Sequence, residues 1–81
     1  MSEDRPVFPI YLRYTNGRSY FKILSPTSMV EWQVVGRTIA MHPFQARTYP
    51  DRVMIDDLIN NTHNNTERIT EQELNNWLGG F

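Results

Sequence analysis

Basic and aromatic residues alternate along two neighbouring segments near the start of the chain. Tyr11 and Arg13 belong to the first segment, and Arg18, Tyr20 and Lys22 belong to the second. Aromatic rings on a sheet can stack on nucleic-acid bases at about 1–3 kcal/mol per base, while the cations hold phosphates. The same residues fit ordinary cross-strand cation–π pairs, worth about 0.5–1 kcal/mol at exposed sites. These five residues are the candidate ligand-binding or partner-binding face. A structural role is favoured for them, because the pI of about 6.0 is far from that of a typical nucleic-acid binder.

The chain offers little for catalysis or for metal binding. His42 and His63 are 21 residues apart and there is no cysteine, so no zinc-ligand pattern is present. Asp56 and Asp57 are adjacent, and on a helix or a strand they point in different directions instead of converging. Neither a phosphate-binding glycine loop nor a Gly-x-Ser-x-Gly motif occurs. We expect no enzyme, no cofactor and no metal site. A deep pocket lined by His42 with Asp or Glu partners would change that expectation.

The elements that position the candidate face form a β-hairpin. Asn16-Gly17 separates two alternating runs, which is the leading signature of a type I′ turn with positive φ at both central residues. A two-residue loop pairs Thr15 with Arg18 and sets the register of every later pair. The predicted core face then carries Ile10, Leu12, Tyr14, Ser19, Phe21 and Ile23, and the predicted solvent face carries Tyr11, Arg13, Thr15, Arg18, Tyr20 and Lys22.

Further strands are predicted after the hairpin. Residues 29–35 alternate again, with Val30, Trp32 and Val34 on one face and Glu31 and Gln33 on the other. Gly36 breaks the pattern, residues 37–41 read as a fourth strand, and residues 44–48 continue it or form a fifth. Pro43 must lie at an edge or a bend, because proline has no N–H for a sheet ladder.

The last part of the chain predicts helical structure. Residues 51–59 favour a short helical turn over a strand, and the Asn-rich residues 60–66 predict a mobile loop. Thr70 and Glu73 form a capping box, and Gly79-Gly80 end the helix. The helix carries one apolar stripe, which packs on the chain's own sheet or docks in a partner's groove: Leu74, Trp77, Leu78 and Phe81.

Composition and charge limit the class of protein. The 81 residues predict one small domain of the α+β class, mainly β: an antiparallel meander of four or five strands plus a C-terminal helix, with a half-open barrel as the alternative form. Residues 1–6 are expected to be flexible. The net charge is +3 over residues 1–52 and −4 over residues 53–81. The two halves attract each other in a folded monomer, or the first half meets an anionic partner. In the former case the acidic segment or the C-terminal helix could cover the candidate face.

These observations predict a noncatalytic protein-interaction or adaptor domain, which binds a protein partner or self-associates. The alternative is a single-stranded nucleic-acid-binding module that uses the outer face of the hairpin. The first residues do not resemble a signal peptide and no apolar run approaches about 18 residues, so a cytoplasmic location without membrane contact is expected.

Overall fold

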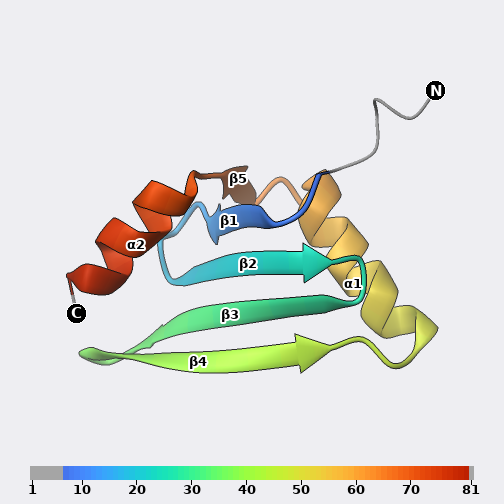
Figure 1. Cartoon of the computed structure of the whole chain (residues 1–81), viewed down its shortest axis with the longest axis horizontal. Helices are drawn as coiled ribbons and strands as arrows, with labels where there is room; N and C mark the ends of the chain where they lie inside the picture. Colours follow the sequence, from blue (N-terminus) through green and yellow to red (C-terminus); the bar gives the residue numbers. More distant parts are fainter. Residues whose placement is uncertain (1–6, 81) are drawn as a thin grey trace.

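Five antiparallel strands form one sheet in a computed structural model that describes residues 7–80. The strands lie in the order β4-β3-β2-β1-β5 (Figure 1). Their bounds are β1 (Ile10–Tyr14), β2 (Ser19–Ser25), β3 (Ser28–Val35), β4 (Thr38–Gln45) and β5 (Thr66–Arg68), and the helices are α1 (Tyr49–Asn60) and α2 (Glu71–Gly79). The predicted mainly β member of the α+β class is confirmed, and the sheet is not closed into a barrel. The expected flexibility of residues 1–6 lies outside the described residues.

The register of the first hairpin is the one that its alternation predicts. Leu12 pairs with Phe21 and Ile10 pairs with Ile23, so all four side chains share one face. We call this the inner face, and it is covered by α1, whose Ile55 is fully buried. The core is therefore a layer between α1 and the inner side of β1, β2 and the start of β3.

The turn of this hairpin, however, is not the predicted type I′. Gly17 has a φ of +75°, whereas Asn16 is not among the residues with positive φ. The Gly17 N–H donates to the Tyr14 carbonyl across a turn centred on Thr15 and Asn16. The Asn16 side chain accepts a hydrogen bond of 2.8 Å from the Arg18 N–H. The loop is thus a four-residue loop, 15–18, with the expected register on either side.

The neighbouring strands explain the wider loop. In a two-residue turn, Thr15 and Arg18 would exchange both backbone hydrogen bonds with each other. Instead, the Thr15 N–H donates to the Asn65 carbonyl at 2.9 Å, and the Arg18 carbonyl accepts from the Val34 N–H at 2.9 Å. Non-local pairing therefore replaces the local closure that the Asn-Gly dipeptide favours.

The second half of the sheet extends further than predicted. β4 runs to Gln45, so residues 44–45 end this strand and no separate strand occupies residues 44–48. β4 is an edge strand, as Pro43 requires, and the fifth strand is β5, which pairs with β1. On β3, Trp32 pairs with Tyr20 and therefore lies on the opposite face from the core, which we call the outer face. Glu31 faces inward, because it pairs with Phe21.

The segment 49–60 is a full helix, which confirms the helical alternative and lengthens it. Thr48 caps its first turn, because its side chain accepts from the Asp51 N–H while the Asp51 side chain accepts from the Thr48 N–H. Pro50 lies in the first turn, where its missing N–H costs nothing. Asn61 ends the helix in the left-handed conformation, and its side-chain oxygen accepts from both the backbone N–H and the hydroxyl of Thr66. These hydrogen bonds thus join the start of the Asn-rich segment, at Asn61, to the first residue of β5, Thr66.

α2 lies on the outer face of the sheet. Its predicted capping box between Thr70 and Glu73 is present, and Gly80 is its C-cap. Leu74 is only 3% exposed, and the Trp77 ring stacks on Tyr20 with centroids 3.7 Å apart. The expectation that Tyr20 faces solvent is therefore wrong, because α2 buries it to 6% exposure. No helix within residues 7–80 is long and apolar enough to cross a membrane.

The Tyr20–Trp77 stack can be tested by truncation. Trp77→Ala removes the ring that covers Tyr20, and we expect the free energy of unfolding to fall by about 2 kcal/mol. Asn75→Ala, on an exposed position of the same helix, should change it by less than about 0.5 kcal/mol. Urea denaturation followed by circular dichroism measures both. Equal stability of the two variants would show that α2 does not hold the outer face.

The positive φ at Gly17 gives a second test. Gly17→Ala places a Cβ on a residue with φ of +75°, and we expect a loss of about 1–2 kcal/mol of unfolding free energy. Gly79→Ala is the matched control, because Gly79 lies in α2, has open space around its Cβ position and has no positive φ. Thermal denaturation should rank Gly17→Ala below the wild type and Gly79→Ala at or above it.

Candidate functional site

The outer face of the first hairpin contains the five residues predicted to bind a ligand, and the chain itself occupies most of it. Arg13 forms an ion pair of 2.7 Å with Glu67 of β5, and Tyr20 and Glu67 together raise the pKa of Arg13. The Tyr20 ring is stacked by Trp77 and not by Arg13. The basic first half and the acidic second half of the chain therefore meet here.

The remaining members of that face also have internal neighbours. The Lys22 ammonium lies 5.9 Å from the centre of the Tyr11 ring, as expected for a cross-strand cation–π pair. Partial burial, and then the charge and the hydrogen bond of Glu71, raise the pKa of Tyr11. Arg18 is exposed in the loop. Apart from Arg18, these side chains thus have structural contacts within the chain.

The apolar stripe of α2 is used in the same way. Leu74 is buried, and Trp77 and Leu78 are half-buried. Phe81, the fourth member of the stripe, lies outside the described residues. The described part of the stripe is packed on the chain's own sheet.

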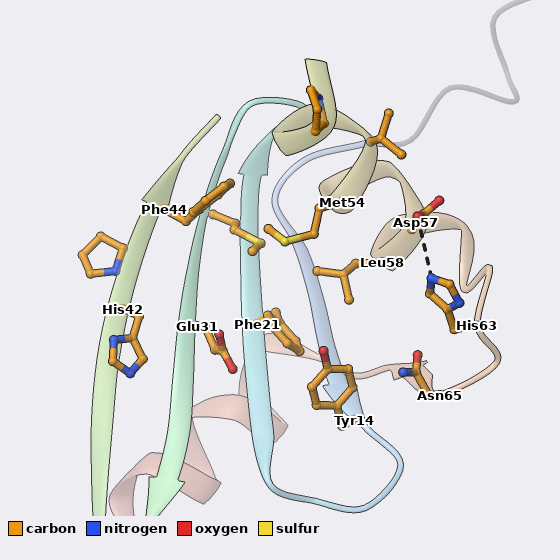
Figure 2. A pocket seen from close by; sticks show the side chains of 14 residues that line it. Tyr14, Phe21, Glu31, His42, Phe44, Met54, Asp57, Leu58, His63 and Asn65 are labelled. Carbon is orange, nitrogen blue, oxygen red and sulfur yellow. Dashed lines mark ion pairs between the residues drawn. The ribbon is translucent and has the colours of Figure 1, made fainter. Parts of the chain in front are cut away.

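The inner face holds a groove that the sequence did not indicate. It has a volume of about 520 Å³ and lies between α1 and the inner side of β3 and β4. Figure 2 shows Phe21, Phe44, Met54 and Leu58 around it, so its floor and walls are apolar. α1 begins beside the end of β4 and crosses the sheet toward β1 (Figure 1), and the groove lies where α1 faces the inner side of the strands.

Glu31 is one of two acidic groups that line this groove, and Asp57 is the other. Glu31 points inward from β3, with Phe21 on one side and His42 of β4 on the other (Figure 2). Its carboxylate accepts a hydrogen bond of 2.9 Å from the Ser19 hydroxyl. No Lys or Arg pairs with it among residues 7–80. The groove therefore contains a half-buried negative charge without a counter-cation.

Tyr14 reports the electrostatic environment beside this carboxylate. Its ring packs edge-on against Phe21 with centroids 5.0 Å apart. Burial, and secondarily the negative charge of Glu31, raise the pKa of Tyr14 above its ordinary value of 10.0. Both causes favour the neutral phenol, because the phenolate would be desolvated and repelled by Glu31.

Two histidines line the groove, but they do not converge. His63 Nε2 lies 3.7 Å from Asp57 Oδ2 at the end of α1, whereas His42 lies on β4 at the other side (Figure 2). The Ser19 hydroxyl donates to Glu31, and Ser19 is only 3% exposed. A buried hydroxyl that donates to a carboxylate is poorly placed to attack a substrate. The groove offers an apolar surface with acidic and imidazole groups at its rim. Among residues 7–80, no group of three or more His, Cys, Asp or Glu side chains could hold a metal ion.

The free edge of β4 borders this groove. The Val34 N–H bonds to the Arg18 carbonyl, so the even-numbered residues of β3 bond to β2 and the odd-numbered ones bond to β4. Met41 pairs with Trp32, and its N–H and carbonyl therefore point away from β3. Ile39 and Gln45 are an even number of residues away from Met41, so their backbone N–H and carbonyl groups also point away from β3. The edge is uncharged, since β4 reads TIAMHPFQ.

Most of this site could not be found from sequence motifs. The alternation of β3 places Glu31 on one face of the sheet and Val30 and Trp32 on the other. In the structure the two apolar residues lie on the outer face, and Glu31 lies on the inner face. Pairing β3 with β2 in the hairpin register would have placed Glu31 beside Phe21 on the core side. An acidic residue at a core-side position is the one available signal.

The charge of Glu31 can be measured through Tyr14. Glu31→Gln should lower the pKa of Tyr14 but leave it above 10, because burial remains. Ultraviolet absorbance of tyrosinate in each protein, with Tyr14→Phe to identify the residue, measures the shift. The pKa of Tyr14 is higher in the folded state than in the unfolded state. The neutral phenol therefore contributes fully to the free energy of unfolding below pH 10, and this contribution is lost as the pH rises through the folded-state pKa. An unchanged titration in Glu31→Gln would contradict this electrostatic account.

No protein-family model, curated protein or solved structure matches this chain. A functional proposal therefore depends on the groove, the β4 edge and the contacts described above.

Proposed function

We propose that this chain is a noncatalytic protein-interaction domain that binds an extended segment of a partner protein along the free edge of β4. The observation that carries the proposal is the combination of an uncharged edge strand, which pairs with β3 alone among residues 7–80, with an apolar groove beside it. Backbone hydrogen bonds at such an edge supply affinity, and pockets for alternate side chains supply specificity.

The two edges of the sheet differ in how open they are. β5 has three residues and carries Glu67 and Arg68, which makes it a short and charged edge. β4 has eight residues and carries no Asp, Glu, Lys or Arg. Pro43 removes one donor from it but leaves Ile39, Met41 and Gln45 with outward backbone groups. A partner strand therefore has most of its bonding positions along residues 39–41.

The groove supplies the side-chain contacts for this mode of binding. A strand added to β4 would place alternate side chains on the inner face, beside His42 and Phe44, which line the groove. The groove volume of about 520 Å³ lies within the range of ligand sites in proteins. Side chains of a partner segment can thus be buried without rearrangement of the core.

The other functional classes have weaker support. Single-stranded nucleic acid would need aromatic rings free for stacking, and Tyr20 is buried beneath Trp77. Catalysis would need converging groups. His42 lies beside Glu31, but His63 lies on the opposite side of the groove, and the Ser19 hydroxyl that donates to Glu31 is buried. A site for a partner's backbone and side chains accounts for the open edge as well as the groove.

A proline substitution tests the use of the β4 edge. Met41→Pro removes an N–H that points to solvent, so the internal ladder stays intact, and Met41→Ala is the matched control that keeps the N–H. Peptides selected on the wild type from a random phage-displayed library should bind Met41→Ala and lose at least about tenfold in affinity for Met41→Pro. Isothermal titration calorimetry with the synthetic peptides measures the affinities.

Ile39→Pro gives an independent second variant, because its N–H also points outward. Circular dichroism should show both proline variants folded. A selection that enriches no peptide, or peptides that bind the folded proline variants as tightly as the wild type, would overturn the β4 proposal.

A further inference from the structure

Glu31 is placed to select the partner's side chain. Glu31 lines the groove between Phe21 and His42, and its carboxylate accepts a hydrogen bond from Ser19. A carboxylate removed from water is stabilised by a cation with which it shares a hydrogen bond. Neither Lys nor Arg lines the groove, and Glu31 forms no ion pair among residues 7–80. Asp57, the other acid of the lining, already has His63 as a neighbour.

The sheet register specifies where that cation would come from. Glu31 and His42 are directly paired across β3 and β4. A partner residue opposite His42 would be the third member of the same row and would face the groove. Two strand spacings separate this residue from Glu31, about 10 Å, so only a long side chain that leans over β4 can meet the carboxylate. Lysine and arginine have this length, and their methylene stems pack well on apolar walls.

We propose that the groove receives one basic side chain, Lys or Arg, from the partner residue opposite His42, with Glu31 as its counter-charge. This inference deepens the proposed function and rests on it. The apolar walls hold the stem, and the carboxylate binds the cationic head. An acidic side chain at the same position would be repelled by Glu31 and by Asp57. The site therefore selects the partner's side chain by the sign of its charge as well as by its length, and we call this selection the charge filter.

A series of three peptides tests the filter. The probes are acetyl-Thr-Val-Thr-X-Thr-Val-Thr-amide with X as Lys, norleucine or Glu. Norleucine has the carbon stem of lysine but lacks the amine, so it isolates the contribution of the charge. Titrations followed by amide chemical shifts should give the Lys peptide about fivefold higher affinity than the norleucine peptide, and the Glu peptide the lowest affinity. The shifts should be largest at Ile39, Met41 and Gln45.

Two variants with the same change in net charge locate the effect. Glu31→Gln should abolish the preference for Lys over norleucine. Asp56→Asn removes one negative charge from an exposed position of α1 that does not line the groove, so it should keep the preference. The norleucine peptide should bind the wild type and Glu31→Gln equally well, because its contacts do not include the charge.

The possible failures are distinguishable. Equal binding of all three peptides, with shifts at the β4 amides that Met41→Pro abolishes, would overturn the charge filter and leave the β4 proposal intact. A preference for Lys that survives in Glu31→Gln would also overturn the filter. Shifts that are absent from β4 for every peptide would overturn the proposed function, and the inference with it.

Discussion

Burial of both faces of β2 is the constraint on which the rest of the structure depends. Ser19, Tyr20 and Phe21 are consecutive and all are buried, so this strand needs a cover on each side. α1 covers Phe21 from the inner face, and α2 covers Tyr20 from the outer face. α1 crosses the inner face from the β4 side to the β1 side (Figure 1), and α2 contacts the outer face through the Tyr20–Trp77 stack. The groove lies on the inner face beside α1, and it reaches β4, which is an edge of the sheet by strand order.

The two sides of β3 carry charged and apolar residues in an unusual arrangement. The inner side of β3 carries Glu31 beside the core, while its outer side carries Val30, Trp32 and Val34. A strand that only supported the core would have the reverse pattern. The placement of a charge toward an apolar layer has a free-energy cost, since the carboxylate loses part of its hydration. Such departures from consistent patterning are concentrated at functional sites, which is why Glu31 is central to the proposed specificity.

Local signals in the sequence were sufficient for part of this fold. Alternation around Asn16-Gly17 predicted the hairpin register, and the Thr70/Glu73 box predicted the start of α2, because both depend on residues close in sequence. The turn conformation could not be predicted, because Thr15 bonds to Asn65 across the sheet. Nor could the burial of Tyr20, which depends on where α2 docks. The groove depends on how α1 lies over β3 and β4. No sequence motif within these elements predicts that placement.

The pairing of β1 with β5 has a consequence for how the chain acquires its fold. Arg13 and Glu67 are 54 positions apart, and β1 lies between β2, its neighbour in sequence, and β5. During synthesis the first hairpin and the meander can form early, but the outer side of Tyr20 stays exposed to water until residues 66–79 have left the ribosome. Closure of this long loop carries an entropic cost before its contacts are made. The contacts of β5 and α2 therefore require the C-terminal residues, and a chain interrupted before them would present an unprotected second edge at β1.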